Sequence, residues 1–507
     1  MNPLLRSAMW LSGATMISKL IGTLQKIPLQ NYAGDSVFGY YNAAYPMYTM
    51  IMFVATAGLP MAVSACFAQA YADGANPLTA HQSWLKLRSR MIIVGIMLGL
   101  FMLLTAPILA NMMGIPELDW PISALALAMF WVPLLSTWRG WVQARGQMQV
   151  SAISQVIEQF VRVTAMVLFL IIGIKFQWPD QISAAAVHLG TAIGAACALG
   201  WAMWRTRVKD VVQEFTITEK PVHIRSRTIL RMAWFASIGS IAFPLFQWID
   251  SLSLPGIMGI EEYGVFTRPF IILQLAAMLM LSLLAAGTPD WVRRYKNGDP
   301  AAAREPMGIL AWIAIPAAAG MSVLGGAMNM MFFTDTNGHA VWSILAVVII
   351  PMSIQLAGAQ ILLWEGRGSV VVRWVLLGSL IKWLLNLVWV HKSEHPLEAG
   401  AWALLITYSF VALGHFVAWL RIVRKRALIS EKRESMKEFI YSMVRATIVM
   451  VLGVILISSS FANMLPMNRL GATLTTLIGL LCGVAIYWWL WKDQMTTWIK
   501  RLGTEME

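Results

Sequence analysis

Long apolar runs alternate with short polar breaks along almost the whole chain. Fourteen of these runs are long enough to cross a bilayer as helices, which takes about 20 residues each. A backbone in lipid must satisfy its own hydrogen bonds, and the runs are too long and too unalternating for barrel strands. The pattern therefore predicts an all-α integral membrane protein with about fourteen transmembrane helices. Their approximate positions are 7–30, 38–70, 91–113, 121–143, 150–174, 181–204, 232–253, 264–287, 307–331, 341–363, 370–390, 399–421, 439–460 and 471–491.

Composition supports this fold class and excludes a large soluble domain. Of the 507 residues, 58% are apolar and 12% are charged, whereas ordinary soluble proteins carry about 25% charged residues. The three cysteines lie within apolar runs, so they imply no disulfide framework. The first apolar run continues past the length of a signal core and is expected to remain as the first helix.

The basic residues are unevenly distributed between the two sides of the predicted helices. A net charge of +13 would suggest nucleic acid in a soluble chain, but cytoplasmic loops of membrane proteins are basic whatever the function. Alternate connections, counted from the N-terminus, hold 28 of the 38 Lys and Arg residues, and the opposite connections hold three. This asymmetry predicts both termini in the cytoplasm, an even number of spans and no nucleic-acid partner.

Three short elements of the first half recur in the second half. Phe38-Gly39, Ala57–Pro60 and Tyr71–Gly74 are echoed by Tyr263-Gly264, Ala286–Pro289 and Tyr295–Gly298. Six predicted spans separate the copies, so the two halves would have the same orientation, as in a two-lobed transporter with its site between the lobes. We therefore expect an N-terminal lobe at 1–219, a C-terminal lobe at 220–437 and a final helix pair at 438–507.

Two lysines lie deep within predicted spans. Lys19 is 13 residues beyond Arg6, which places it roughly 20 Å into the first helix. Lys382 is close to the middle of its span, with Asn386 one turn later on the same face. A charge at the bilayer centre costs at least about 2.5–3.5 kcal/mol, so such residues usually face a watery cavity or a partner. We expect both lysines to face a cavity.

Two further cations are nearer to helix ends. Lys26 is near the outer end of the first span, where a lysine can also extend its amine to the interface. Arg268 lies in the eighth span and would join Lys19 and Lys26 if both lobes face one cavity.

The fifth span carries a polar face that includes an acid and a base. Glu158 and Arg162 are four residues apart, with Gln155 and Gln159 on the same face. One interpretation is an ion pair neutralised for burial. The other is a carboxylate and an arginine that exchange partners with an anionic substrate or a coupling cation. Asp250 in the seventh span is open to the same two kinds of interpretation, as a hydrated carboxylate or a coupling group.

The sequence contains no sign of a cofactor site. It has no Gly-x-x-x-x-Gly-Lys-Ser/Thr loop for nucleotide phosphates, and its seven histidines show no metal-ligand spacing. The predicted outer connections are too short for an active-site domain, so we do not expect an enzyme. Several tryptophans fall near span ends, where an aromatic belt is expected, among them Trp138, Trp141 and Trp204.

The stretch around the fourth and fifth spans resembles a family signature. It reads Trp138-Arg139-Gly140-Trp141-Val142-Gln143, then Met148, then Ser151 to Val163 with Ser154, Gln155, Glu158, Gln159 and Arg162. This resembles the polysaccharide-transport branch of the multidrug/oligosaccharidyl-lipid/polysaccharide exporter superfamily. Within it, the chain is similar to the group of the stage V sporulation protein B and the MurJ-like lipid II flippases. Other matching stretches are Ile17–Gly22, Lys26–Pro28, Gly39–Tyr41, Tyr45–Tyr48, Ala57–Pro60 and Gly378–Lys382 with Asn386.

The resemblance implies a fold and a function. It implies two six-helix lobes in a V around a cationic cavity, with a final helix pair that lines a groove for a lipid tail. It also implies flipping of an undecaprenyl-pyrophosphate-linked sugar from the cytoplasmic to the outer leaflet of the bacterial plasma membrane. Lys19 and Lys26 match basic positions of the family motifs. Residues 286–291 depart from the family pattern, which leaves open whether lipid II or another cell-envelope polysaccharide precursor is the substrate.

The working hypothesis is alternating access of a lipid-linked oligosaccharide, with cell-envelope synthesis machinery as a further partner. Its substrate-binding residues are Lys19, Lys26, Arg162, Arg268 and Lys382, because pyrophosphate needs several charge-assisted contacts to leave water. Glu158 and Asp250 are candidates for coupling to a cation or to the membrane potential. The alternatives are a cation-coupled multidrug exporter, a membrane enzyme of lipid-linked sugar metabolism and a non-transporting scaffold.

Overall fold

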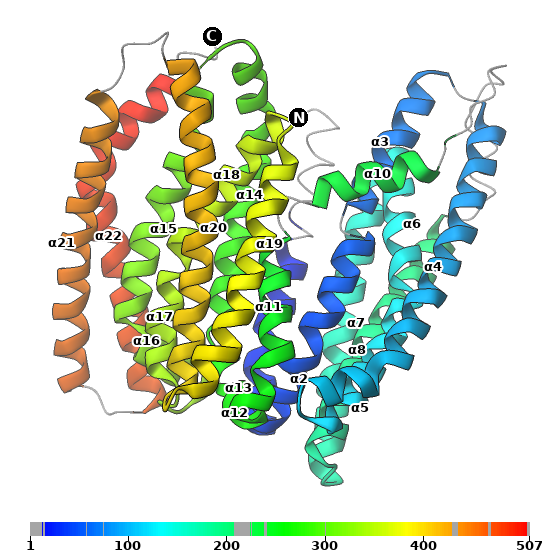
Figure 1. Ribbon diagram of the computed structural model, residues 1–507, viewed down its shortest axis with the longest axis horizontal. Helices are drawn as coiled ribbons and strands as arrows, with labels where there is room; N and C mark the ends of the chain where they lie inside the picture. Colours follow the sequence, from blue (N-terminus) through cyan, green and yellow to red (C-terminus); the bar gives the residue numbers. More distant parts are fainter. Residues whose placement is uncertain are drawn as a thin grey trace. The chain divides into compact units, whose positions relative to one another are not determined.

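The computed structural model is built from helices and their short connections (Figure 1), and the described residues contain no strand. This confirms the predicted all-α class. The structure describes residues 13, 16–56, 58–74, 76–206, 224, 226–237, 241–299, 301–427, 434–464 and 468–503.

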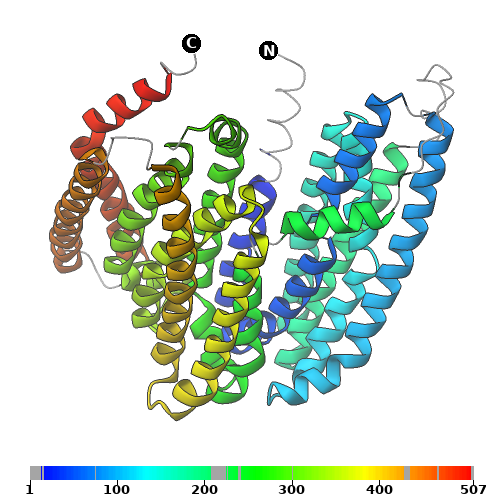
Figure 2. The same cartoon turned by 45° about the horizontal axis from the view of Figure 1, so that its top comes forward.

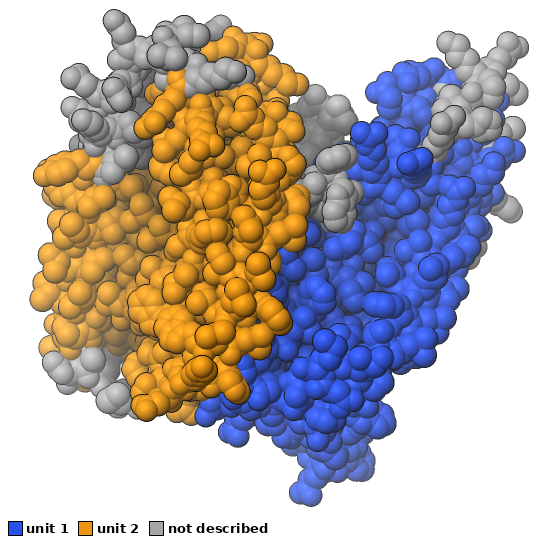
Figure 3. All heavy atoms as spheres, viewed as in Figure 1, with its two compact units in different colours: residues 1–264 blue, residues 265–507 orange. Residues whose placement is uncertain are grey.

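The first compact unit comprises Met1–Gly264 (Figure 3). After a helical segment at 16–24 it contains α2 (Lys26–Thr56), α3 (Leu59–Ala72), α4 (Pro77–Met112), η1 (Pro116–Leu118), α5 (Asp119–Met129), α6 (Val132–Ala144), α7 (Met148–Lys175), α8 (Asp180–Arg205), α10 (Ser226–Ser237), α11 (Ala242–Ser253), α12 (Pro255–Met258) and the start of α13 (Ile260–Thr267). Within it, α8 packs against α7, α5 and α2, and α7 and α8 run side by side (Figures 1 and 2).

The second unit comprises Val265–Glu507. It contains α14 (Phe270–Lys296), η3 (Ala301–Ala303), α15 (Glu305–Val323), α16 (Gly325–Phe333), α17 (His339–Val347), α18 (Ile349–Trp364), α19 (Gly368–Leu384), η4 (Leu385–Trp389), η5 (Val390–Lys392), α20 (Pro396–Ala427), α21 (Glu434–Met464) and α22 (Arg469–Gly503). Here α18 packs against α14, α15 and α20. The last two helices pack on each other and on the body of the unit, α21 against α15 and α22 against α16.

The first unit extends to Gly264, beyond the lobe boundary expected from the sequence. It includes α10 and α11 because α10 packs on α3 and α11 packs on α2. The expected lobe boundary at 219/220 lies outside the described residues, and the one at 437/438 falls in the first turn of α21. The lobe boundaries themselves stay a prediction, as does a lipid-tail groove along the final helix pair.

Twelve helical stretches in the described parts of the chain are long and apolar enough to cross a membrane. The number differs from about fourteen for two local reasons. The first two predicted spans form one stretch, Met16–Ala72, which bends where Gly34 has a φ of 80° instead of ending. The run expected at 232–253 is divided between α10 and α11, which have 12 residues each. The chain is a multi-pass membrane protein.

Glycines in the left-handed conformation reveal the internal repeat in the backbone. The positive-φ glycines of the described chain all form pairs, one member in each half, at a nearly constant separation along the sequence. A residue with a side chain adopts this conformation at a cost, so each glycine marks a turn or helix end that requires it. The pairs, with their φ angles, are Gly34 (80°) and Gly259 (85°), Gly74 (77°) and Gly298 (92°), Gly114 (75°) and Gly338 (73°), and Gly146 (73°) and Gly366 (70°).

A second kind of repeat-related glycine pair forms a close helix crossing. Gly39 on α2 lies against the carbonyl oxygen of Ile260, and Gly264 on α13 lies against the carbonyl oxygen of Asp35. A methyl group on either glycine would overlap the opposite backbone. The two glycines are corresponding positions of the two repeats, and they make equivalent contacts at one helix crossing. The crossing is possible only because neither residue has a side chain.

The core of the first unit includes tryptophans that were expected at the membrane interface. Trp84 stacks on Trp141 with ring centroids 4.7 Å apart, and Trp138 packs edge-on against Trp84. Trp138 also donates a hydrogen bond to the Thr206 hydroxyl at 3.0 Å. The aromatic-belt interpretation was wrong for Trp138 and Trp141, which are buried, whereas Trp204 is 60% exposed.

Candidate functional site

Lys26 lies at the start of α2, inside the first unit. Its side chain is only 6% exposed. Its amine lies 5.8 Å from the centroid of the Tyr45 ring, which gives the ammonium a weak cation–π partner and no carboxylate. The helical segment 16–24 and α2 meet at Gln25, whose N–H donates to Ile21 and whose carbonyl oxygen accepts from Leu29, so the helical hydrogen bonds continue across it.

Arg162 comes from the middle of α7 and is 8% exposed. A methyl group on Gly22 would lie 2.7 Å from the Arg162 Nη2 atom, so the glycine makes room for the guanidinium beside the first helix. From the other side, Gly190 and Gly194 let α8 approach closely. Methyl groups there would lie 2.8 and 2.6 Å from the backbone oxygens of Arg162 and Glu158. The Arg162 Nε atom is buried and has no hydrogen-bond partner among the described residues.

Lys26 and Arg162 are close enough to repel each other electrostatically. Neither takes part in an ion pair within the described chain, although each is more than nine-tenths buried. A buried charge without a counter-charge is costly, and two like charges increase that cost. The pair therefore forms a positive site that an anion would stabilise.

The nearby carboxylate of Glu158 is held by another arginine. Arg139 on α6 donates from Nη2 to Glu158 Oε2 at 2.7 Å and from Nε to the Ser154 hydroxyl at 2.9 Å. Gln143 donates to Ser151 at 2.8 Å, one turn further along both helices. These polar groups of the signature stretch join α6 to α7. The interpretation of Glu158 and Arg162 as an ion pair was wrong, because Arg139 occupies the carboxylate instead.

A stack of aromatic rings lies beside the two cations. The ring of His188 on α8 stacks on Tyr41 at a centroid distance of 4.3 Å, and Tyr41 stacks on Tyr45 at 5.6 Å. The His188 Nε2 atom lies 3.2 Å from the Tyr41 carbonyl oxygen, and Gln25 donates to the Tyr41 hydroxyl at 3.4 Å. Arg162 lies within electrostatic range of these tyrosines and also of the Glu158 carboxylate, which Arg139 holds. Sequence reasoning missed this cluster, and the i, i+4 spacing of Tyr41 and Tyr45 was the only signal for it.

Lys19 lies on the helical segment 16–24 and is exposed. It precedes Gly22 by three residues and so lies on the same side of that helix. This is the side that contacts Arg162. The structure therefore brings Lys19, Lys26 and Arg162 to one region of the first unit.

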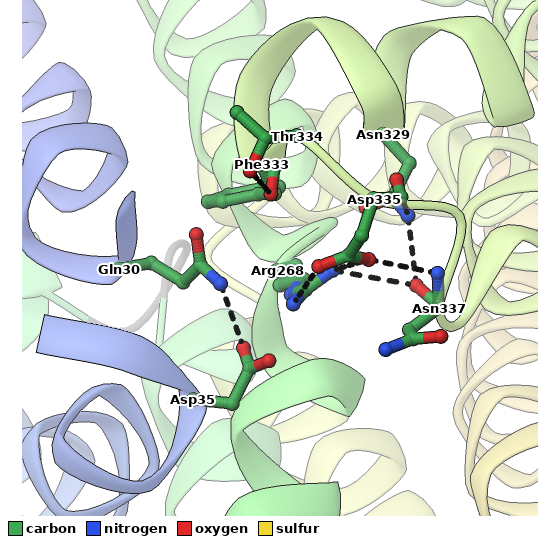
Figure 4. A network of polar contacts seen from close by, with 8 residues as sticks. All are labelled: Gln30, Asp35, Arg268, Asn329, Phe333, Thr334, Asp335 and Asn337. Carbon is green, nitrogen blue, oxygen red and sulfur yellow. Dashed lines mark hydrogen bonds and ion pairs between the residues drawn. The ribbon is translucent and has the colours of Figure 1, made fainter. Parts of the chain in front are cut away.

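Arg268 belongs to the second unit and is tightly paired with an acid. Its side chain is fully buried and donates to both carboxylate oxygens of Asp335, at 2.6 and 2.9 Å (Figure 4). Its guanidinium also lies 5.2 Å from the Phe333 ring centroid, and Asn329 holds the loop through the Asn337 carbonyl oxygen. The uncompensated charge that suggested a substrate role for Arg268 is therefore absent. No pattern in the sequence indicated that Asp335 would fold back onto it.

The other two predicted site residues are fully buried. Lys382 on α19 donates to the Asn386 side chain at 3.2 Å and to the Gly400 carbonyl oxygen at 3.4 Å, as its place on the same helix face as Asn386 allows. A π-helical turn follows at Leu385–Trp389. Asp250 lies in α11 of the first unit with no exposed surface. The described residues contain no group of three His, Cys, Asp or Glu side chains suited to a metal ion.

These features define a multi-pass membrane protein with buried cations in its first unit. The chain belongs to the polysaccharide biosynthesis protein family, whose sequence pattern matches residues 4–289. Within the superfamily named above, it falls in the group similar to MurJ and the stage V sporulation protein B. The relatives of this group include a lipid II flippase, and the chain is not an enzyme.

Two curated relatives and one solved structure illustrate the similarity. The chain is 24% identical over 471 residues to the lipid II flippase MurJ of Bacillus subtilis (strain 168), covering 84% of this chain and 86% of that protein. It is 24% identical over 420 residues to the uncharacterized membrane protein YabM of the same organism, covering 79% and 76%. A structure of lipid II flippase MurJ in an inward closed conformation superposes with a TM-score of 0.68 at 11% identity, covering 96% and 99%.

Proposed function

We propose that this protein is a flippase for a polyprenyl-pyrophosphate-linked saccharide. In this proposal Lys26 and Arg162 bind the pyrophosphate, and the exposed Lys19 attracts it on approach. The observation that carries the proposal is the pair of buried cations without ion pairs in the described chain. A pyrophosphate offers two negatively charged groups to two cations, and charge-assisted hydrogen bonds supply the energy that the anion needs to leave water.

The proposal assigns no direct contact to Arg268, because Asp335 already neutralises it. Lys382 is assigned a supporting role, because it already donates hydrogen bonds to the Asn386 side chain and the Gly400 carbonyl oxygen. Translocation is proposed to run from the cytoplasmic to the outer leaflet of the plasma membrane, with both termini in the cytoplasm. Lipid II is one candidate substrate, and another cell-envelope precursor is the other.

The test is direct binding to the full-length protein in nanodiscs. Lys26→Gln and Arg162→Gln should each weaken binding of undecaprenyl pyrophosphate tenfold or more, since hydrogen bonds to charged groups contribute about 1.5–3 kcal/mol. Lys175→Gln is the matched control, because Lys175 is an exposed cation at the end of the same helix as Arg162. Equal affinity in all four proteins would refute the proposed binding site.

The same cations discriminate between this proposal and a multidrug exporter. A cationic drug would be repelled by Lys26 and Arg162, so it should not compete with undecaprenyl pyrophosphate. Competition by cationic drugs, with loss of that competition in Glu158→Gln, would favour the exporter.

Coupling is proposed through the membrane potential or a cation. The two candidates for a group that exchanges a cation are Glu158, which Arg139 holds, and the buried Asp250. Asp250→Asn should then make flipping in proteoliposomes insensitive to an ionophore that abolishes the gradient. A wild-type rate that is indifferent to ionophores would remove coupling from the mechanism.

A further inference from the structure

We propose that the Tyr45 ring is the subsite for the sugar that is attached directly to the pyrophosphate. The protein would therefore recognise a glycosylated polyprenyl pyrophosphate in preference to the bare one. This inference rests on the proposed function, since it assumes that Lys26 and Arg162 hold the phosphates.

The exposure of the rings singles out Tyr45. Tyr41 and Tyr48 are each 3% exposed and His188 has no exposed surface, whereas Tyr45 is half-buried. The buried rings pack behind and beside it, with Tyr48 at a centroid distance of 5.8 Å and His188 parallel to it at 6.1 Å. Tyr45 is thus the member of the stack that can offer ring surface to a ligand.

The position of Tyr45 next to a cation fits a glycosyl phosphate. The Lys26 amine lies 5.8 Å from the ring centroid. In a glycosyl pyrophosphate one oxygen joins the sugar to the phosphate, so a sugar must lie next to whichever cation holds that phosphate. Hexose rings have an apolar face of C–H groups, which packs on an aromatic face, and a polar edge, which suits nearby hydroxyl donors.

The stack is also held rigidly before any ligand binds. Pro46 follows Tyr45 in α2, and Tyr41 is tied to α8 through His188 and to Gln25 through its hydroxyl. A preformed surface loses little conformational entropy on binding, so its contacts contribute more fully to affinity. Packing alone would account for Tyr41, Tyr48 and His188, but it leaves the partial exposure of Tyr45 beside Lys26 without a role.

The experiment compares two ligands in the full-length protein in nanodiscs. These are undecaprenyl pyrophosphate and undecaprenyl pyrophosphate that carries one N-acetylhexosamine. We expect the wild-type protein to bind the glycosylated ligand about fivefold to tenfold more tightly, the range that one aromatic contact supplies. Tyr45→Leu should abolish this preference, so that the glycosylated and the bare ligand bind with equal affinity. Tyr45→Phe, which keeps the ring, should retain the preference.

Each other outcome has a defined meaning. A wild-type protein without a preference would overturn the inference, and so would a Tyr45→Leu protein that keeps it. If Tyr45→Leu weakens both ligands equally, the ring only supports Lys26 and the inference is wrong. Arg162→Gln separates this inference from the proposed function, because it should weaken both ligands and leave the preference intact. If Tyr45→Leu does not fold, Tyr45→Met, which is unbranched and flexible, provides the same comparison.

Discussion

Equivalent positions in α7 and α19 carry cations with different surroundings. Arg162 follows the left-handed Gly146 at the same sequence distance at which Lys382 follows Gly366, the repeat partner of Gly146. Both side chains are buried. Lys382 donates to Asn386 and Gly400, whereas Arg162 has no ion pair in the described chain and its Nε atom has no hydrogen-bond partner.

The same contrast extends to the other cations of each unit. In the second unit Arg268 is paired with Asp335, and Arg294 donates to Glu305 and Asp299. In the described part of the first unit, Lys26 has only the Tyr45 ring. The left-handed glycines of the two repeats correspond, but Arg268 of the second unit is paired with a carboxylate, whereas Lys26 and Arg162 have no ion pair in the described part of the first unit. Anion binding is therefore expected in the first unit, and the following predictions test that difference.

The largest expected effect is on stability in the second unit. Asp335→Ala removes a carboxylate that accepts two hydrogen bonds from the buried Arg268, so the free energy of unfolding should fall by about 3 kcal/mol. Arg162→Gln removes a buried charge that has no ion pair in the described chain, and it should leave stability unchanged or raise it. Thermal unfolding of both variants in nanodiscs measures the two changes in stability. A loss of stability as large in Arg162→Gln as in Asp335→Ala would mean that the two units do not differ in how their buried cations contribute to stability.

The next effect concerns the arginine that holds Glu158. Arg139→Ala frees a carboxylate four residues before Arg162, on the same face of α7, and the two should then pair. Flipping in proteoliposomes should fall about tenfold, which corresponds to about 1.4 kcal/mol. The double variant Arg139→Ala/Glu158→Gln should recover most of the activity, because no carboxylate remains to neutralise Arg162. Failure of this rescue would show that Arg139 acts in another way.

How far the sequence predicts this site depends on distance along the chain. Spacing within one helix predicted that Lys382 and Asn386 share a face, and the structure adds a hydrogen bond between them. The same spacing predicted a shared face for Glu158 and Arg162. It could not predict that Arg139, on the preceding helix, takes the carboxylate. Asp335 is 67 residues beyond Arg268, in a loop, and no periodicity connects them.

The fold was predictable to a greater degree, because helix length in a membrane follows directly from the apolar runs. The span count was less certain where the chain bends without leaving the apolar run. Gly34 bends α2 at a left-handed residue, and hydropathy does not register backbone angles. The tryptophan core was missed for a similar reason, since Trp138 and Trp141 lie near a helix end yet face inward.

A further prediction tests whether the two repeats have the same backbone conformation at corresponding glycines. Gly146→Ala and Gly366→Ala should each lower the free energy of unfolding by about 1–2 kcal/mol, the cost of a left-handed residue with a side chain. Neither glycine has a neighbour within 4 Å of an added methyl group, so no steric term is added. The two variants should be equal within error in thermal unfolding. Unequal losses would show that the repeats differ in backbone as well as in charge.

The smallest effect is expected for an exposed cation of the second unit. Arg293 pairs with Asp290 at 2.7 Å, but its side chain is 71% exposed, so Arg293→Gln should cost less than about 0.5 kcal/mol. Arg294→Gln, one residue further on, breaks contacts with Glu305 and Asp299 and should cost clearly more. Thermal unfolding of both variants shows whether burial decides the cost of losing a charge.

The crossing of α2 and α13 at Gly39 and Gly264 has a thermodynamic consequence of its own. Alanine at either position would force the two backbones apart, and the separation that relieves one overlap also relieves the other. The losses from Gly39→Ala and Gly264→Ala should therefore be strongly non-additive, with the second methyl group adding little to the first. Two positions far apart in the sequence, one from each repeat, would then behave in a double-mutant cycle as a single locus.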